Sequence, residues 1–329
     1  MRAIVQDAYG SPEALHLQDL EVPVPGPGEV LVRVHAAGVD PGEWALLTGL
    51  PYMIRVMGFG LRRPRLRVRG TDVAGRVEAI GEGVAELQPG DEVFGLCTGS
   101  FAEYTCVPES KIVVKPAGLS FVEAAAVPSS GLTALAVLRD YAQVTPGQGV
   151  VIVGAAGGVG TFAVQIAKAF GANVTGVCST TGLDLVRSIG ADHVVDYTRE
   201  DFADGSRLYD VIIDTGGNRS LSRLRHALAP RGTLVIVGGR GGRWLGGTVR
   251  NLRALILSRF VSQTLHAPFL NHLGGHNDDL RALIALIEAG TVSPVVDRTF
   301  PLLEVPDAMT HLREGHAQGK VVIAVRAEA

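Results

Sequence analysis

The residues best suited to chemistry are a set of glycines between an apolar segment and an amphipathic one. Residues 150–167 read VVIVGAAGGVGTFAVQIA, so β-branched residues lead into a glycine-rich turn and then into apolar residues at helical spacing. A strand, a tight turn and a helix in this order bring backbone amides and a helix N-terminus close to a pyrophosphate. The turn predicts a dinucleotide site, with candidate residues Gly154, Ala156, Gly157, Gly158 and Val159.

The turn after the second strand indicates which dinucleotide is bound. An acidic residue there, about 20 residues beyond the glycines, reads the ribose hydroxyls of NAD, and its charge would repel a 2′-phosphate. This chain instead has Ser179, Thr180 and Thr181, and no Arg or Lys lies in the turn. We therefore predict NADPH as the cofactor and NADH as the less favoured one, with Ser179 and Thr180 beside the ribose.

Strands and helices must alternate to position these turns, and beyond residue 120 they do. Apolar strand patterns are separated mostly by helical patterns, and they fall at residues 150–153, 173–177, 194–196, 211–214 and 234–237. This alternation predicts an α/β fold with a doubly wound parallel sheet of the Rossmann type. A helix over 278–289 and a final strand over 320–325 follow. Before residue 120, short β-rich pieces between turns such as PGPG and QPGD predict a small barrel-like β domain.

Composition excludes several protein classes. The 329 residues are 47% hydrophobic and 19% charged with net charge −3, which fits two domains with substantial cores. Three cysteines without CxxC spacing argue against a disulfide framework or a cysteine-rich zinc site. The first ten residues contain no apolar signal region, and Pro146 and six glycines interrupt the uncharged run 141–167. We expect a cytoplasmic protein without a membrane span.

A basic segment offers an alternative function. Residues 55–69, RVMGFGLRRPRLRVR, carry six arginines and no acidic residue. Such a run attracts phosphates, and a dinucleotide-sensing module that binds nucleic acid with little turnover is one interpretation. The net negative charge of the chain and the scarcity of aromatic residues in the run argue against it, so nucleic acid is an unfavoured partner.

Several longer motifs are similar to those of one family. They are VPVPGPGEVLVRVHAAGVDP, GTDVAGRVEAIGEGV, PGDEVFGL, FAEYTCVPES, SGLTAL, GAAGGVG, GADHVVDY and GKVVIAV. On these motifs the chain resembles the medium-chain dehydrogenase/reductase superfamily in its zinc-independent, quinone-oxidoreductase-like branch. The resemblance implies a GroES-like catalytic domain over 1–120 and 296–329, an inserted Rossmann domain over 121–295, an active site in the cleft between them, and a homodimer.

Two positions at which zinc-dependent relatives carry metal ligands differ in this chain. Asp40 stands where they have a cysteine, and Gly70, Thr71 and Asp72 stand where they have Gly-His-Glu. The four-cysteine lobe that holds their structural zinc is also absent from the sequence. Zinc usually takes thiolate and imidazole ligands, so these departures predict an active site without metal.

Without a Lewis acid to stabilise an alkoxide, reduction is the favoured direction. Hydride from NADPH then goes to a quinone or to the β-carbon of an α,β-unsaturated carbonyl compound, whose own oxygen takes up the charge. The predicted function is therefore a zinc-independent, NADPH-dependent oxidoreductase that acts on such a small molecule. A carrier-linked enoyl reductase is the alternative within the same class of enzyme.

The resemblance also implies catalytic residues. Asp40 and Thr133 match positions near the nicotinamide and the substrate. Trp44 and Tyr52 lie in a segment that borders the substrate cleft of relatives. A phenol such as Tyr52 can protonate an enolate, and so can solvent.

Four more residues complete the predicted cofactor site. By resemblance, Tyr197 matches a residue near the adenosine phosphate and Lys320 matches the start of a strand near the cofactor. Gly238 and Gly239 follow a strand, and ligands bind at the carboxyl ends of strands in open α/β sheets.

Overall fold

Two compact units make up the chain, of which the computed structural model describes residues 1–217, 219–239, 244–268 and 277–326. Unit 1 comprises Met1–Leu132, Gly275–Glu288 and Pro294–Ala329, and unit 2 comprises Thr133–Gly274 and Ala289–Ser293. The division expected from the sequence lies at residues 120 and 296. The compact units differ from it mainly because the helix over residues 277–288 belongs to unit 1.

Unit 2 is built on a six-stranded sheet in which all the described strand pairs are parallel. The spatial order is β10-β9-β8-β11-β12-β13. The strands are β8 (Gly149–Val153), β9 (Asn173–Cys178), β10 (His193–Asp196), β11 (Tyr209–Asp214), β12 (Leu228–Ile236) and β13 (Thr264–His266). The predicted doubly wound α/β fold is confirmed, and the three-residue β13 is a strand that the sequence pattern did not indicate.

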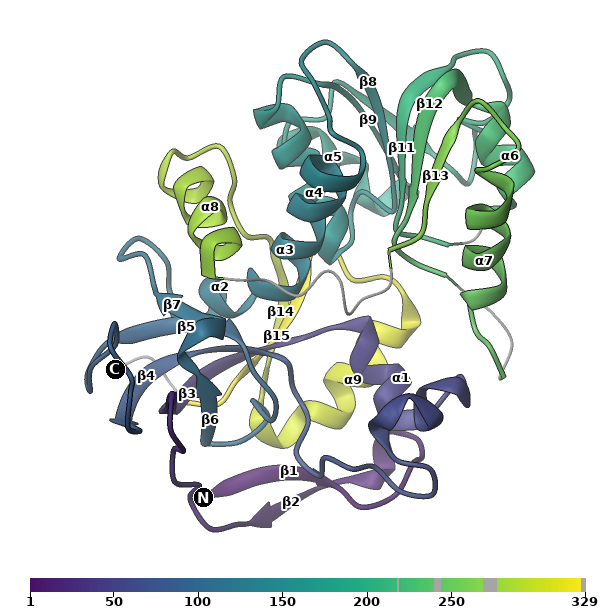
Figure 1. Cartoon of the computed structure of the whole chain (residues 1–329). Coiled ribbons are helices and arrows are strands. Elements are labelled where there is room, and N and C mark those ends of the chain that lie inside the picture. The colour runs from purple at the N-terminus through teal and green to yellow at the C-terminus, as the bar shows by residue number, and fades with distance from the viewer. Residues whose placement is uncertain (218, 240–243, 269–276, 327–329) are drawn as a thin grey trace. The chain divides into compact units, whose positions relative to one another are not determined.

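Helices pack against this sheet, as Figure 1 shows for α4 and α5 beside β8 and β9 and for α6 and α7 beside β12 and β13. They are α4 (Gly158–Ala169), α5 (Leu183–Ser188), α6 (Leu221–His226) and α7 (Thr248–Leu257), and α3 (Pro128–Ala136) with the π-helical turn η4 (Val137–Tyr141) precedes them. α4 forms because Phe162, Ala163 and Ile166 recur at helical spacing, and all three are fully buried. The apolar stripe read from the sequence is the face that packs on β8 and β9.

The strand order creates a topological switch point between the central strands β8 and β11. Strands β9 and β10 lie on one side of β8, and β11 to β13 lie on the other. The connections therefore diverge at the carboxyl ends of β8 and β11, where open α/β sheets bind ligands. The glycine-rich turn follows β8 at this point, so the fold places the predicted dinucleotide site where the topology requires it.

Unit 1 is built on a seven-stranded sheet of order β14-β15-β3-β4-β5-β7, with β6 paired to β3. Its strands are β3 (Glu29–Val39), β4 (Asp72–Ile80), β5 (Glu92–Leu96), β6 (Tyr104–Pro108), β7 (Ile112–Val114), β14 (Val296–Pro301) and β15 (Lys320–Ala324), and β1 (Arg2–Gln6) and β2 (Leu15–Asp19) form a separate hairpin. Val30, Val32 and Val34 alternate inward from β3 and are fully buried. This is the GroES-like domain that the resemblance predicted.

Helices and short helical turns complete unit 1. They are α1 (Pro41–Thr48), α2 (Phe121–Ala125), α8 (Asn277–Glu288) and α9 (Val305–Glu314), with the turns η1 (Pro12–Ala14), η2 (Arg55–Phe59), η3 (Glu109–Lys111) and η7 (Leu302–Glu304). α2 starts with a capping box, because the Ser120 side chain accepts from the Glu123 amide and Glu123 accepts from the Ser120 amide.

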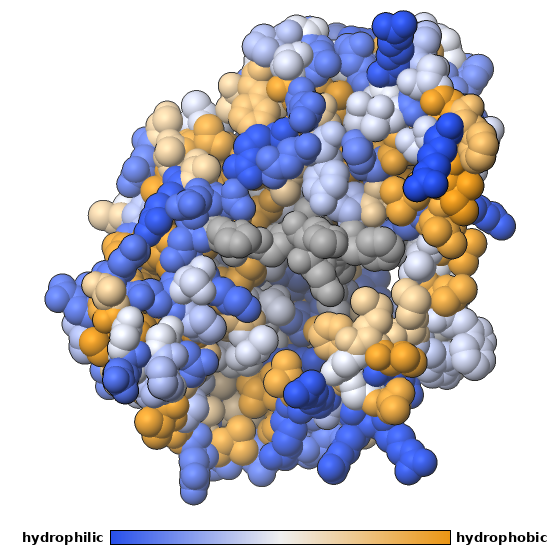
Figure 2. All heavy atoms as spheres, viewed as in Figure 1, coloured by the Kyte–Doolittle hydropathy of each residue, from blue (hydrophilic) through white to orange (hydrophobic). Residues whose placement is uncertain are grey.

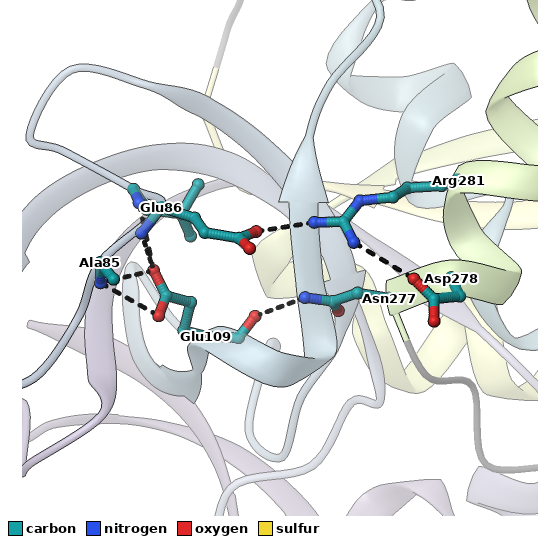
Figure 3. A network of polar contacts seen from close by, with 7 residues as sticks. Ala85, Glu86, Glu109, Asn277, Asp278 and Arg281 are labelled. Atoms are coloured by element: carbon teal, nitrogen blue, oxygen red, sulfur yellow. Dashed lines mark hydrogen bonds and ion pairs between the residues drawn. The ribbon is translucent and has the colours of Figure 1, made fainter.

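Polar contacts and two leucines attach α8 to unit 1 (Figure 3). Arg281 pairs with Glu86 at 2.6 Å and with Asp278 at 3.2 Å. Asn277 Nδ2 donates to the Glu109 carbonyl at 3.0 Å, and the Glu109 carboxylate accepts from three consecutive backbone amides of the turn before β5. On its inner face, α8 completely buries two of its three leucines, Leu280 and Leu283. These contacts explain why the helix belongs to unit 1.

α7 exposes part of its apolar surface. Val249, Leu252 and Ile256 follow helical spacing and are 41%, 56% and 53% exposed. Figure 2 shows apolar side chains over the part of the molecule where Figure 1 places α7. Within the described ranges, the helices are too short or too polar to cross a membrane. The homodimer and the cytoplasmic location stay predictions.

Gly160→Ala tests the contact between α4 and the glycine-rich turn. A Cβ on Gly160 would lie 2.1 Å from the Gly154 carbonyl oxygen and 2.8 Å from Ala155 Cα, so the helix must move away from the strand. We expect the free energy of unfolding to fall by at least about 2 kcal/mol in urea titrations, since overpacking costs this much.

Gly157→Ala is the matched control for this substitution. Its Cβ would lie 3.5 Å from the same carbonyl oxygen, and the backbone at Gly157 has φ −82° and ψ 175°. The loss should be about 1 kcal/mol or less, from a poorer helix N-cap. Equal losses in the two variants would contradict the proposed contact.

Candidate active site

The glycine-rich turn after β8 is held by the end of the neighbouring strand. The amides of Gly154 and Ala155 donate to the Val177 carbonyl at 2.9 and 3.0 Å, and the Gly157 amide donates to the Gly154 carbonyl at 3.1 Å. The 12-residue helix α4 then starts at Gly158, so its first amides lack intrahelical acceptors and its positive dipole end lies at this turn. An anionic pyrophosphate fits this environment.

Close backbone contacts keep side chains out of the switch point. A Cβ on Gly154 would lie 2.5 Å from Thr215 Oγ1, and a Cβ on Gly238 would lie 2.1 Å from the Thr215 carbonyl oxygen. A Cβ on Gly239 would lie 3.2 Å from Gly247 Cα. The predicted residues around this switch point are partly or fully accessible, and they are Gly154, Ala156, Gly157, Gly158, Val159, Gly238 and Gly239. A cradle of bare backbone at these strand ends fits a dinucleotide.

The predicted adenosine-binding residues follow the adjacent strands β9 and β10. Ser179 and Thr180 come after β9, and Tyr197 comes after β10 with 54% of its surface exposed. The Thr180 hydroxyl donates to Asp196 Oδ2 at 2.5 Å, so the fold brings a carboxylate to a turn that has no acidic residue of its own. Sequence reasoning missed Asp196 because only the pairing of β9 with β10 brings it to Thr180.

A second carboxylate lies on the other side of the switch point. Asp214 ends β11, is fully buried, accepts from the Gly217 amide at 3.0 Å and forms an ion pair with Arg250 of α7. Arg250 also donates to the Gly238 carbonyl at 3.4 Å, so it links α7 to the loop after β12. Sequence reasoning missed this pair as well, although an acid at the end of the strand VIID was an available signal.

Unit 1 contains a buried lysine between two carboxylates. Lys320 Nζ lies 2.5 Å from Asp40 Oδ1 and 3.0 Å from Asp72 Oδ2, and the three side chains are 2%, 14% and 0% exposed, respectively. The Ser129 amide donates to Asp72 Oδ1 at 3.0 Å, and the Ser129 hydroxyl donates to the same oxygen. We call Lys320, Asp40, Asp72 and Ser129 the buried ion cluster.

Sheet topology assembles the buried ion cluster. β3 is antiparallel to both β4 and β15, so the end of β3 meets the starts of its two neighbours. Asp40 follows β3, Asp72 opens β4 and Lys320 opens β15. A Cβ on Gly38 would lie 2.6 Å from Asp72 Oδ2, so a glycine on β3 provides the space that the Asp72 side chain occupies.

Burial and the neighbouring charges act in opposite directions on the pKa values of Lys320 and Asp40. Burial lowers the pKa of Lys320, but the Asp40 and Asp72 carboxylates outweigh it and the net pKa lies above its usual value. Burial raises the pKa of Asp40, but the Lys320 ammonium outweighs it and the net pKa lies below its usual value. Burial and the Asp40 charge together raise the pKa of Asp72. Lys320 and Asp40 therefore form the ion pair, and Asp72 is the member that binds a proton most readily.

The buried ion cluster decides whether zinc fits this part of the protein. Within the residues that the structure describes, no group of three or more His, Cys, Asp and Glu side chains is placed to hold a metal ion. Asp40 and Asp72 face the Lys320 ammonium, and burial raises the pKa of the Cys97 thiol, which disfavours the thiolate that zinc requires. The donor set does not fit zinc, because a protein cation already lies between the carboxylates. The role of Lys320 as a cofactor residue stays a prediction.

The other predicted catalytic residues lie on helices or next to one. The Trp44 ring on α1 packs 4.5 Å from the Arg313 guanidinium, and the Tyr52 ring lies 4.8 Å from the Arg55 guanidinium. Both aromatics share unit 1 with Asp40. Thr133 lies on α3, belongs to unit 2 and is 9% exposed. Their catalytic roles stay predictions.

The protein itself engages half of the arginines in the basic segment 55–69. Arg55 donates to two backbone carbonyls, Arg67 pairs with Asp7 at 2.7 Å, and Arg69 is 5% exposed and donates to Gln6. Arginines used in this way contribute less to a surface that attracts nucleic acid. The structure therefore adds no support to the nucleic-acid alternative.

A buried acid near the buried ion cluster was missed by sequence reasoning. Glu43 on α1 is 2% exposed, and among the described residues its Oε2 atom has no hydrogen-bond partner. Burial raises the pKa of Glu43 to about 7, although the Arg69 guanidinium acts in the other direction. Unit 1 thus contains an acid that changes its charge near neutral pH, and no motif pointed to it.

Two family models match the chain. One is described as "Alcohol dehydrogenase GroES-like domain" and matches residues 26–117, and the other is described as "Zinc-binding dehydrogenase" and matches residues 189–323. The mouse "NAD(P)H oxidoreductase RTN4IP1, mitochondrial" is 33% identical over 363 residues, covering 99% of this chain and 89% of the relative. The human "Quinone oxidoreductase" is 32% identical over 338 residues, covering 98% and 97%.

Solved structures share this fold over their whole length. The Escherichia coli quinone oxidoreductase complexed with NADPH has a TM-score of 0.84 and 25% identity, covering 98% of this chain and 100% of that one. The CurK enoyl reductase has a TM-score of 0.86 and 25% identity, covering 98% of both chains. The chain is therefore similar in sequence to NAD(P)H and quinone oxidoreductases, and in fold to a quinone oxidoreductase solved with NADPH and to an enoyl reductase.

Lys320→Met tests how much the buried ion cluster contributes to the free energy of unfolding. The substitution leaves Asp40 and Asp72 buried without their cation, and such a loss costs about 3–5 kcal/mol. We expect urea titrations to show a loss of this size. In the Asp72→Asn background the same substitution should cost less, since one of the two carboxylates is already gone. A loss of under about 1 kcal/mol in the wild-type background would contradict the importance of the cluster.

Glu43→Gln tests the buried acid through pH. The Glu43 pKa rises from its ordinary 4.5 to about 7 in the folded protein, so its contribution to stability is complete below pH 4.5 and declines as pH rises through about 7. The stability of the wild type relative to Glu43→Gln should fall by roughly 3 kcal/mol over this range, and then level off. Urea titrations from pH 4.5 to 8 measure this difference, and parallel curves for the two proteins would refute it.

Proposed function

This chain belongs to the medium-chain dehydrogenase/reductase superfamily, in its quinone-oxidoreductase-like branch, and we propose that it transfers hydride from NADPH to a quinone or an α,β-unsaturated carbonyl compound without zinc. Its relatives establish the coarser statement that it is an NAD(P)H-dependent oxidoreductase. The choice of NADPH, the acceptor and the absence of zinc are our proposal.

The bare-backbone cradle at the carboxyl ends of β8, β11 and β12 is the observation that carries this proposal. It combines the N-terminus of α4 with the close backbone approach at Gly154 and Gly238, where a Cβ would lie 2.5 and 2.1 Å from Thr215 atoms, and this combination suits a pyrophosphate. The relative solved with NADPH has the same fold over the full chain. In this assignment the amides of Gly157, Gly158 and Val159 lie at the pyrophosphate, and Ser179, Thr180 and Tyr197 lie at the adenosine.

When bound, NADPH supplies the hydride, and the chain's own residues supply position and charge. The oxygen of the acceptor becomes anionic as hydride arrives and then takes a proton. We assign Asp40, held at its position by Lys320, to the surroundings of the nicotinamide and the acceptor, and Tyr52 as a hydroxyl that can deliver the proton in competition with solvent. Catalytic roles for Trp44 in unit 1 and for Thr133 in unit 2 are also part of this proposal.

The proposal without zinc depends on the buried ion cluster. Metal-assisted relatives polarise an oxygen with a cation, and here the cation between the two carboxylates is the Lys320 ammonium. Reduction of a conjugated acceptor needs no stronger Lewis acid, since the charge spreads over the acceptor itself. The physiological direction is therefore reduction.

A carrier-linked enoyl reductase is the second candidate function. It is favoured by the similarity of the fold to the CurK enoyl reductase, which matches over 98% of both chains. The chemistry would be the same hydride transfer to a conjugated carbonyl. The two candidates differ only in whether the acceptor is free or attached to a carrier.

The decisive experiment is the loss of nicotinamide absorbance with NADPH, or separately NADH, and a panel of ortho-quinones, para-quinones, simple enones and an enoyl thioester. We expect turnover with NADPH that a chelator does not change, since no step requires a metal. Activity that a chelator abolishes and zinc restores would refute the zinc-free mechanism. Turnover of the enoyl thioester alone would select the second candidate function.

A further inference from the structure

A cluster of polar side chains lies beside the predicted ribose site, where the sequence showed neither an acid nor a cation. Thr180 follows β9, Asp196 ends β10, and Thr198 and Arg199 come soon after it. β9 and β10 are parallel neighbours, and Asp196 pairs with Cys178 at their ends, so both segments leave the sheet at the same edge. We call Thr180, Asp196, Thr198 and Arg199 the Asp196 cluster.

Asp196 organises this cluster through both of its oxygens. Oδ2 accepts from the Thr180 hydroxyl at 2.5 Å and lies 3.6 Å from Arg199 Nε. Oδ1 accepts from the Thr198 hydroxyl at 2.7 Å and from the Thr198 amide at 3.0 Å. The Thr180 and Thr198 hydrogen bonds hold the pKa of Asp196 below its usual value, so the carboxylate is ionised at neutral pH.

The two sides of the Asp196–Arg199 pair differ in exposure. The Asp196 side chain is 5% exposed, and internal donors occupy its oxygens. The Arg199 side chain is 73% exposed, so most of its guanidinium donors face solvent. The charge of Asp196 is thus directed inward and offset by Arg199, whereas Arg199 presents a cation outward at the strand ends.

The Asp196 cluster also lies against the glycine-rich turn. Gly182 ends the short turn η5 (Thr180–Gly182), and a Cβ on it would lie 2.7 Å from Ala156 Cβ. Ala156 belongs to the turn that faces the N-terminus of α4. A nucleotide with its pyrophosphate on that turn therefore has its adenosine ribose within reach of η5, since ribose and pyrophosphate are bonded directly to each other.

From this placement we propose that Arg199 binds the 2′-phosphate of NADPH and that Asp196 is the positioning residue that holds Arg199 beside Thr180. The proposal rests on the proposed function only in requiring that unit 2 binds a nicotinamide dinucleotide. A guanidinium matches a phosphate with two parallel hydrogen bonds, which a neutral hydroxyl cannot provide.

This proposal changes the role of Thr180. The single hydroxyl proton of Thr180 is given to Asp196, so Thr180 has only acceptor capacity left for a ligand. An acceptor suits a ribose hydroxyl and not a phosphate. Arg199 therefore carries any preference for NADPH, and without Arg199 the same turn would suit NADH.

The test uses the full chain and two nucleotides that differ only in the 2′-phosphate, adenosine 2′,5′-bisphosphate and adenosine 5′-monophosphate. Calorimetry gives their dissociation constants for the wild type, for Arg199→Gln and for Arg187→Gln. Arg187 is the matched control, because it lies on the nearby α5, is 58% exposed and pairs with Asp184, and its substitution removes the same charge.

We expect the wild type to bind the bisphosphate more tightly than the monophosphate. Arg199→Gln should raise the dissociation constant of the bisphosphate about ten- to a hundredfold, since one charge-assisted phosphate contact is lost. The dissociation constant of the monophosphate should stay unchanged. Arg187→Gln should change the binding of the bisphosphate less than threefold. In steady-state assays, the same loss should appear in the KM for NADPH with kcat unchanged.

Three results would overturn the proposal, and they separate its failure from that of the proposed function. Tighter binding of the monophosphate by the wild type would mean that the Asp196 charge dominates and that NADH is the cofactor. If Arg199→Gln and Arg187→Gln weaken binding of the bisphosphate equally, Arg199 acts only through the general positive potential of the surface and does not contact the phosphate. If neither nucleotide binds the wild type, the dinucleotide site itself is wrong, and the proposed function falls with it.

Discussion

The buried ammonium of Lys320 is the constraint on which unit 1 depends. A charge away from water is tolerated only when it is paired and hydrogen-bonded, and Asp40, just after β3, and Asp72, at the start of β4, meet this requirement. Three strand ends must therefore converge, and Ser129 adds the start of α3 through its bonds to Asp72. The same convergence places a protein cation between the carboxylates, and our proposal of a mechanism without zinc rests on this feature.

The candidate binding site of unit 2 depends instead on glycines, which have no side chain. The glycines after β8, β11 and β12 allow backbone segments to approach more closely than any Cβ permits, so amides and a helix N-terminus lie open to a ligand. Asp214 with Arg250, and Asp196 with Arg199, hold the loops on the two sides of that opening. Unit 2 thus supplies the backbone cradle that our proposal assigns to the hydride donor, and unit 1 contains the buried ion cluster.

The elements of unit 2 were predictable because their signals are local. Apolar runs of four to six residues between helical patterns placed β8, β9 and β11 within a residue or two of the observed strands. The pattern failed for β13, which has three residues and too little periodicity to detect. The grouping of α8 with unit 1 also had no local signal, since its attachment through Arg281 to Glu86 spans 195 residues.

The features of the candidate site also separate into those that the sequence shows locally and those that depend on the fold. The sequence by itself determined the glycine-rich turn, the missing acid after β9 and the loss of thiolate and imidazole ligands, because each is a matter of residue type at a fixed spacing. Only the tertiary structure decided that Lys320 meets Asp40 across 280 residues and that Asp196 and Arg199 lie beside Thr180. The physical reason is that an ionic side chain is equally suited to any partner of opposite charge. Only the sheet topology selects which one lies within about 3 Å of it.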